Sequence, residues 1–243
     1  GALAGIQLVH NGQSVSNYLS RMPALAPSPC PTETANSTQA RGMDKEDIKV
    51  LRRWFREAAI RSQRAGYDII YVYAAHGIMT LLYQFILKRY NQRTDEYGGS
   101  LENRMRFPIE IFKAIREVWP QGKPISVRIS AHDWTPGGIT PVDAVEIARA
   151  FKAAGADIID CSSGQVSKKE KPIYGRMFQT PFSDRIRNQV GIPTIAVGAI
   201  FEADNANTII AAGRADLCAV ARPHLANPAW ILTEGAKSGY AGV

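Results

Sequence analysis

A recurring pattern, in which a glycine ends a helical stretch and an apolar strand follows, most constrains how this chain can fold. The pattern occurs three times, with an aspartate two or three residues after each glycine, at Gly66 and Asp68, Gly155 and Asp157, and Gly213 and Asp216. Glycine at a helix C-terminus adopts the left-handed conformation that redirects the chain into a strand. The pattern predicts βα units around a buried parallel sheet, with functional residues at the carboxyl ends of the strands.

Composition limits the classes of function. The chain has 243 residues, of which 45% are hydrophobic, and this length suits one large α/β core. Its net charge of +7 comes from scattered basic residues without interleaved aromatic residues, which favours an anionic small molecule over nucleic acid. No apolar run reaches the roughly 18 residues that cross a bilayer, so no membrane partner is expected. Three widely spaced cysteines (Cys30, Cys161 and Cys218) favour a reducing, cytoplasmic location.

Strand and helix signals alternate along the chain. Strands are predicted at residues 5–10, 69–73, 125–130, 157–162, 194–199 and 217–222, and helix starts at Asp44, Ser100, Thr140, Thr180 and Glu202. The spacing predicts a TIM (β/α)8 barrel, as a single domain over residues 1–243, that lacks about two βα units at its N-terminus. A doubly wound sheet is the alternative, although no strand precedes a G-x-G-x-x-G turn. Residues 13–42 are predicted to form a long loop over the barrel mouth.

One long motif resembles a known family. Residues 91–107, from Asn91 to Phe107, are similar to the signature of the Old Yellow Enzyme superfamily of FMN-dependent oxidoreductases, and residues 5–12 resemble its third barrel strand. The first half of the chain, with Tyr73 and His76, is most similar to the trimethylamine and histamine dehydrogenase branch. The second half is more similar to the reductase domain of aryl-CoA hydroxylase/reductase fusions. The resemblance implies an FMN-binding barrel enzyme with NAD(P)H as electron donor.

Two strand-end residues suit the flavin ring. The Gln7 amide both donates and accepts hydrogen bonds, as the pyrimidine edge of a flavin requires. Arg128 lies near the end of a predicted strand, where a fixed cation would stabilise the negative charge of reduced flavin near N1. A rim salt bridge is the alternative role for Arg128.

The turn after residues 194–197 suits a phosphate. Gly198 and Ala199 end a predicted strand before a helix, and glycine allows close approach of the backbone to a ligand. Arg222, expected at the end of the last strand, adds a bidentate partner. The resemblance implies that these positions bind the FMN phosphate. A simple tight turn is the alternative for Gly198.

Tyr73 and His76 are the predicted catalytic residues, because a spacing of three lets both face the barrel mouth. A histidine there can donate to a substrate oxygen or act as a base, although a hydrogen-bonded core histidine is the alternative. In ene-reducing relatives a tyrosine two residues after the histidine delivers a proton, and here that position is Ile78.

Two other groups of residues have open interpretations. His132 and Asp133 form either an acid/base pair or part of a surface turn. The basic residues of positions 168–176 form either a solvated loop or an anion site. The sequence holds no metal-ligand cluster, and no metal is expected.

The sequence therefore predicts an FMN-dependent oxidoreductase that passes hydride from NAD(P)H to an electron-poor C=C bond of an enone or an enoyl- or aryl-CoA. One alternative is an FMN-dependent amine dehydrogenase, and another is a flavin-free, non-catalytic remnant. The expected partner is a small-molecule substrate, with a homo-oligomer or further domains of a longer chain also possible.

Overall fold

A parallel six-stranded sheet organises the structure, a computed structural model that describes residues 2–18, 20–32, 39–240 and 242. Its strands, in spatial order, are β1 (Gly5–Leu8), β5 (Ile69–Ala74), β6 (Ile125–Ser130), β7 (Ile158–Ser162), β8 (Thr194–Val197) and β9 (Leu217–Ala219). Every neighbouring pair is parallel. All six predicted strands are confirmed. The last one ends at Ala219 instead of continuing to Arg222.

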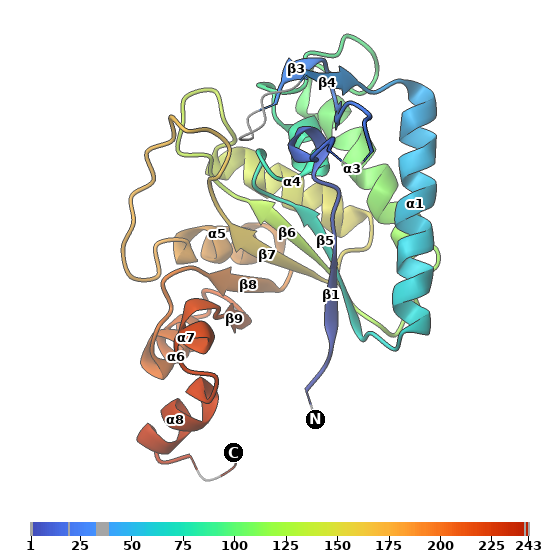
Figure 1. Ribbon diagram of the computed structural model, residues 1–243. Coiled ribbons are helices and arrows are strands. Elements are labelled where there is room, and N and C mark those ends of the chain that lie inside the picture. Colours follow the sequence, from blue (N-terminus) through green and yellow to red (C-terminus); the bar gives the residue numbers. More distant parts are fainter. Residues whose placement is uncertain (1, 19, 33–38, 241, 243) are drawn as a thin grey trace.

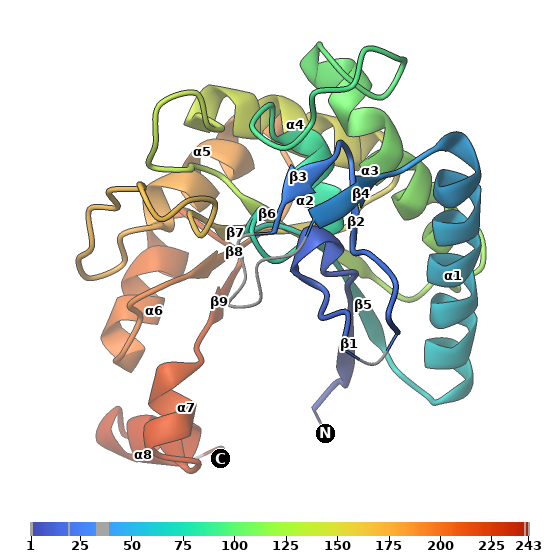
Figure 2. The ribbon, with the colours of Figure 1, turned by 45° about the horizontal axis from the view of Figure 1, so that its top comes forward.

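Helices cover one face of this sheet, and the other face is concave (Figures 1 and 2). They are α1 (Lys45–Arg64), α3 (Leu101–Arg116), α4 (Pro141–Ala153), α5 (Thr180–Val190) and α6 (Ala203–Ala211), and all five were predicted. Capping boxes start α1 at Asp44 and α4 at Thr140. Three shorter helices were not predicted, namely α2 (Leu81–Ile86), α7 (Arg222–Ala226) and α8 (Trp230–Lys237). The arc of strands with helices outside is the predicted incomplete (β/α) barrel, which excludes the doubly wound alternative.

Alternation along the strands separates the core from the concave face. On β5, Ile70, Val72 and Ala74 are fully buried toward the helices. Tyr71 and Tyr73, which alternate with them, are only partly buried on the other face. The apolar core therefore lies between sheet and helices, and the polar side chains of the strands point into the concave side.

The segment predicted as a loop contains regular structure. Within residues 13–42, β2 (Leu25–Ala26), β4 (Gln39–Gly42) and β3 (Cys30–Pro31) form a small sheet in that order, next to a 3₁₀ turn at Gly12–Ser14. Residues 19 and 33–38 of this segment lie outside the described residues. Its position over the barrel mouth stays a prediction. In the part of the chain that the structure describes, no helix is long and apolar enough to cross a membrane.

The family-like motif at residues 91–107 has a structural role. Asn91 donates through Nδ2 to the carbonyl oxygens of Phe85 and Tyr97, at 2.7 Å each. Arg93, whose side chain is 11% exposed, donates to the carbonyl oxygens of Pro27 and Met43. Its guanidinium also forms an ion pair with Asp95 at 2.6 Å. The motif therefore fastens the connection between α2 and α3 to the segment that carries the small sheet.

Replacing Arg93 by alanine should lower the free energy of unfolding by about 2–3 kcal/mol, because two carbonyl groups and a carboxylate lose their charged donor. Arg53→Ala is the matched control, since Arg53 forms only an exposed ion pair with Glu57 and its loss should cost less than about 0.5 kcal/mol. Urea unfolding followed by circular dichroism measures both. Equal losses in the two variants would contradict the structural role of Arg93.

Candidate functional site

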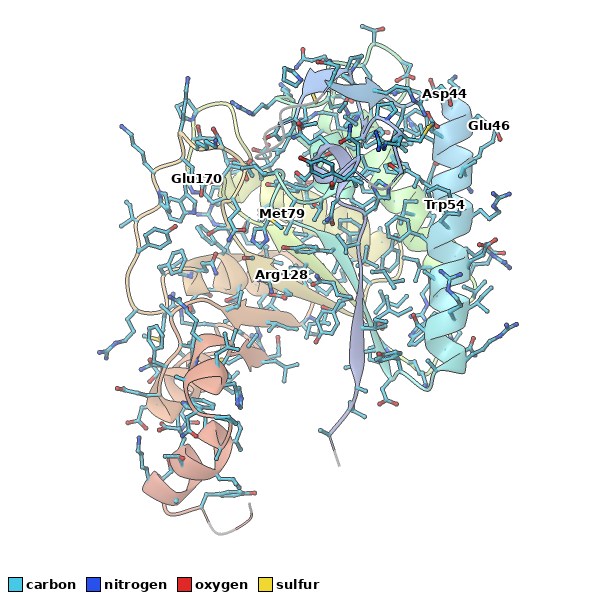
Figure 3. All side chains as sticks on the ribbon, in the orientation of Figure 1. Asp44, Glu46, Trp54, Met79, Arg128 and Glu170 are labelled. Atoms are coloured by element: carbon cyan, nitrogen blue, oxygen red, sulfur yellow. The ribbon has the colours of Figure 1, made fainter. Side chains whose placement is uncertain are left out.

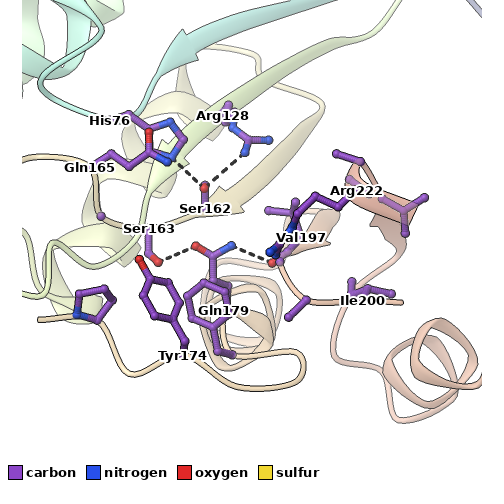
Figure 4. A pocket seen from close by; sticks show the side chains of 18 of the residues that line it. His76, Arg128, Ser162, Ser163, Gln165, Tyr174, Gln179, Val197, Ile200 and Arg222 are labelled. Carbon is purple, nitrogen blue, oxygen red and sulfur yellow. Dashed lines mark hydrogen bonds between the residues drawn. The ribbon is translucent and has the colours of Figure 1, made fainter. Parts of the chain in front are cut away.

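A cavity of about 420 Å³ opens at the carboxyl ends of β7, β8 and β9 (Figure 4). Five of the seven predicted site residues line it, namely His76, Arg128, Gly198, Ala199 and Arg222. They come from the ends of three strands, β5, β6 and β8, and from the start of α7. The topology therefore brings together residues that are up to 146 positions apart, from His76 to Arg222.

Tyr73 does not line the cavity itself but contacts the predicted histidine. Its hydroxyl is hydrogen-bonded to His76 Nδ1, and the two rings meet edge to face with centroids 5.6 Å apart. His76 Nε2 lies 2.9 Å from the Ser162 hydroxyl. The backbone N–H of His76 donates to Ser130 Oγ at 2.9 Å and holds the residue at a φ of 57°. A non-glycine residue in this left-handed region is strained and is retained only where its surroundings fix it.

His76 is neutral in this environment. Burial, and secondarily the positive charge of Arg128, lowers the pKa of His76 from 6.5 to about 3. A neutral imidazole has one donor and one acceptor, and the hydroxyls of Tyr73 and Ser162 occupy both. A substrate atom that binds His76 must therefore displace one of these partners.

Arg128 forms an ion pair on the concave face. Its Nη1 donates to Asp160 Oδ2 at 2.5 Å and its Nη2 to Ser162 Oγ at 3.3 Å. The Asp160 side chain is only 5% exposed, and burial raises the pKa of this carboxyl although Arg128 opposes the shift. Figure 3 shows Arg128 on the open side of the sheet. Arg128 thus both forms a salt bridge and lines the cavity.

A chain of hydrogen bonds runs along the cavity wall across three strand ends (Figure 4). Trp134 Nε1 donates to Ser163 Oγ at 3.0 Å, and Ser163 donates to Gln179 Oε1 at 2.5 Å. Gln179 Nε2 then donates to the carbonyl of Val197 at 2.8 Å. Ser162, Ser163 and Gln179 were not among the predicted site residues, because isolated serines and glutamines carry no local signal for hydrogen bonding in a cavity wall.

This chain of hydrogen bonds supports the turn after β8. Gly198 and Ala199 both have positive φ, 104° and 54°. A Cβ at Gly198 would lie 2.4 Å from Gln179 Nε2, so only glycine fits there. The backbone N–H groups of Gly198, Ala199 and Ile200 donate to no other described residue. They leave three adjacent donors at the cavity wall.

Arg222 differs from the prediction in its local structure. It is the first residue of α7 and not the end of a strand, because β9 stops at Ala219 and Pro223 is compatible with a helix start. Its side chain is exposed, and its guanidinium carbon lies 5.4 Å from the ring centroid of Phe201. Arg222 still lines the same cavity as Gly198.

Gln7 lies apart from the cavity. It is exposed and pairs in register with Tyr71, so its side chain lies on the concave face. The residue also borders a separate hollow between β1 and α1, beside Trp54 and Arg61 (Trp54 is labelled in Figure 3). Gln7 shares the concave face with Arg128 but does not line the cavity. Its role toward a flavin stays a prediction.

His132 and Asp133 do not form a surface turn. Asp133 is fully buried and accepts hydrogen bonds of 2.6 Å from the Tyr83 hydroxyl and the Ile139 backbone N–H. Burial raises the pKa of Asp133 to about 7. This carboxyl holds the loop that carries Trp134 against the cavity. Among the residues that the structure describes, no group of three potential metal ligands occurs.

Comparison with known proteins gives consistent matches. A family model described as "NADH:flavin oxidoreductase / NADH oxidase family" matches residues 1–239. An NADPH dehydrogenase of Geobacillus thermodenitrificans is 41% identical over 232 residues, which are 95% of this chain and 65% of that relative. Histamine dehydrogenase from Rhizobium sp. 4-9 has a TM-score of 0.86 and 36% identity, over 99% of this chain and 35% of that one. A 2-naphthoyl-CoA reductase complex has a TM-score of 0.86 and 25% identity, over 98% of this chain and 38% of that one.

We expect the His76 ring to stay neutral far below its usual pKa. The unfolded chain binds this proton below pH 6.5 and the folded chain only near pH 3, so this group makes stability fall as the pH drops from 6.5 toward 3. Asp133 acts in the opposite sense, because its pKa rises from 3.8 to about 7 and the folded chain binds the extra proton in between.

The His76→Asn variant separates the two effects. It should show less loss of stability than the wild-type protein when the pH falls from 6.5 to 4, in urea unfolding at each pH. Ring ¹⁵N chemical shifts measure the histidine directly. A His76 ring that becomes protonated near pH 6.5 would refute the buried, neutral assignment.

Proposed function

Because the chain belongs to the NADH:flavin oxidoreductase / NADH oxidase family, we propose that the protein takes hydride from NAD(P)H through FMN and passes it to an electron-poor C=C bond. The family match confirms the predicted superfamily and, with it, the flavin-dependent oxidoreductase class and the FMN cofactor. The chain spans about 65% of the length of the curated relative it matches. The activity and the substrate of the whole protein are therefore part of the proposal.

The convergence on one cavity of two cations and three backbone donors without a partner among the described residues carries this proposal. The N–H groups of Gly198, Ala199 and Ile200, with Arg222 beside them, form a cradle of the kind that binds phosphate. Arg128 lines the same cavity. This arrangement fits the two negative regions of FMN, which are its phosphate and its reduced ring.

Each residue has a defined part in the proposal. When bound, FMN supplies the chemistry of accepting hydride and passing it on. The turn at Gly198 and the guanidinium of Arg222 hold the phosphate, and Arg128 stabilises negative charge on the ring. His76, held neutral by its buried surroundings, would bind an enone or thioester oxygen after that oxygen displaces Tyr73 or Ser162 from the ring.

Amine oxidation is the second candidate, favoured by the hydrogen bond between Tyr73 and His76 and by the similarity to histamine dehydrogenase. The charge of the cavity does not decide between the two candidates. Arg128 is paired with Asp160, both guanidinium groups are assigned to FMN, and the Glu170 carboxylate also lines the cavity. The similarity to NADPH dehydrogenases favours the reductase.

The deciding experiment uses the full-length, FMN-loaded protein without oxygen. We expect NADPH to bleach the flavin absorbance and 2-cyclohexenone or crotonyl-CoA to restore it. Bleaching by histamine or trimethylamine, but not by NADPH, would establish the amine dehydrogenase instead. A protein that retains no flavin and bleaches with none of these compounds would refute both candidates.

Gly198→Ala should weaken FMN binding about 10-fold or more, because the new methyl group collides with Gln179 and the positive φ is strained. Gly175→Ala is the matched control, since Gly175 lies in the loop before α5 with no atom within 4 Å of an added Cβ. Fluorescence titration of FMN measures both dissociation constants. Similar FMN binding by the two variants would remove the Gly198 turn from the cofactor site.

A further inference from the structure

The loop between β7 and α5 carries four cations in nine residues. Lys168, Lys169, Lys171 and Arg176 are all exposed. None of them forms an ion pair with another residue that the structure describes. The acid among them, Glu170, uses its carboxylate to accept the backbone N–H of Val166 instead. Four cations against the one carboxylate of Glu170 give the loop a formal net charge of +3.

The charge of this loop is concentrated. Three other exposed lysines have acidic partners, in the pairs Lys45 with Glu96, Lys49 with Glu46, and Lys237 with Glu234. Like charges that lie close together repel one another. A loop that collects four cations and a single acid is suited to an anionic ligand.

Two backbone contacts fix this loop at the cavity. The backbone N–H of Lys171 donates to the carbonyl of Trp134 at 2.9 Å, and the backbone N–H of Met177 donates to the carbonyl of Ala199 at 3.1 Å. Glu170, just before the first of these contacts, and Tyr174, between the two, line the cavity. In Figure 1 the loop runs out beyond the carboxyl ends of the strands before it enters α5. The loop therefore borders the cavity, and its four cations are sequence neighbours of residues that line it.

An exposed aromatic ring accompanies the cations. Tyr174 is 74% exposed and packs edge to face on Phe178, with ring centroids 5.3 Å apart. Figure 4 shows its ring at the edge of the cavity. A supported ring with one open face provides a stacking surface for a base, and neighbouring cations bind phosphates. Both features together suit a nucleotide better than a simple inorganic anion.

We propose that the β7–α5 loop binds the phosphate groups of a nucleotide substrate, and that Tyr174 contacts its base, while the reactive end of that substrate enters the cavity. This inference rests on the proposed function and adds a second anion site to it. The FMN phosphate belongs to the Gly198 turn, so the loop cations remain for another ligand. Two substrates share the required chemistry, the dinucleotide hydride donor and a coenzyme A thioester acceptor.

The test compares two triple variants of the full-length, FMN-loaded protein. The loop variant is Lys168→Ala, Lys169→Ala and Lys171→Ala. The control variant is Lys49→Ala, Lys88→Ala and Lys113→Ala, which removes the same charge from exposed positions that do not line the cavity. Calorimetric titration with NADP⁺ and, separately, with coenzyme A gives dissociation constants that need no turnover.

We expect the loop variant to bind one of these nucleotides about 10-fold more weakly than the control variant, with a smaller dependence on salt, because exposed charge pairs are individually weak and are screened. Weaker binding of NADP⁺ assigns the loop to the hydride donor, and weaker binding of coenzyme A assigns it to the acceptor. Binding of both nucleotides within twofold of the control, or no binding of either to the wild-type protein, would overturn the proposal.

A Tyr174→Phe and Tyr174→Ala pair tests the base contact. The phenylalanine variant keeps the ring and should bind the assigned nucleotide within twofold of wild type. The alanine variant should bind it about 5-fold more weakly. Failure of NADPH to bleach the flavin of the wild-type protein would refute the proposed function, whereas these binding constants decide the loop assignment separately.

Discussion

Parallel, in-register pairing of the central strands is the constraint on which the site depends. Tyr73 on β5 pairs with Arg128 on β6, and Arg128 pairs with Asp160 on β7. Paired residues of neighbouring strands point to the same face, so this row projects together into the concave side. On the same face, the next pair toward the carboxyl ends is Ser130 with Ser162. Ser130 accepts the backbone N–H of His76, and Ser162 is hydrogen-bonded to its ring.

The row also sets the electrostatics of the site before any ligand binds. One network of hydrogen bonds runs from Asp160 through Arg128 and Ser162 to His76 and ends at Tyr73. It contains one buried carboxylate with one guanidinium, and the nearby positive charge helps to keep the imidazole uncharged. A half-buried ion pair adds little to stability by itself, so the value of this one lies in fixing charge and orientation.

Helix starts and strand-end residues could be predicted, because they depend on residues close together in the sequence. Asp44 and Thr140 were identifiable as helix starts because their side chains cap the backbone three residues later. Arg128 and Gly198 were identifiable because their residue types are informative at a strand end. The short strands of residues 25–42 were missed, since two-residue strands have no periodicity to detect. The helix at Arg222 was also missed, although Pro223 signals a helix start.

The buried polar support of the cavity was beyond the reach of sequence reasoning. Ser163 and Gln179 are 16 residues apart and meet only because β7 and α5 pack together. Tertiary proximity creates their role, and neither residue type indicates it. Gln7 shows the converse, because a suitable residue at a strand end lies on β1, at one edge of the described sheet, and does not line the cavity.

Strand register and loop length place different limits on how such a protein can diverge. One residue inserted in β6 before Arg128 would move every following side chain of that strand to the opposite face of the sheet. Arg128 would then point into the helix layer and no longer into the concave side. The β7–α5 connection carries no such periodic requirement, and its length and side chains can change while the barrel stays intact. Ligand preference can therefore change through substitutions in that connection. The row of Tyr73, Arg128 and Asp160 can change only if the strand register is kept.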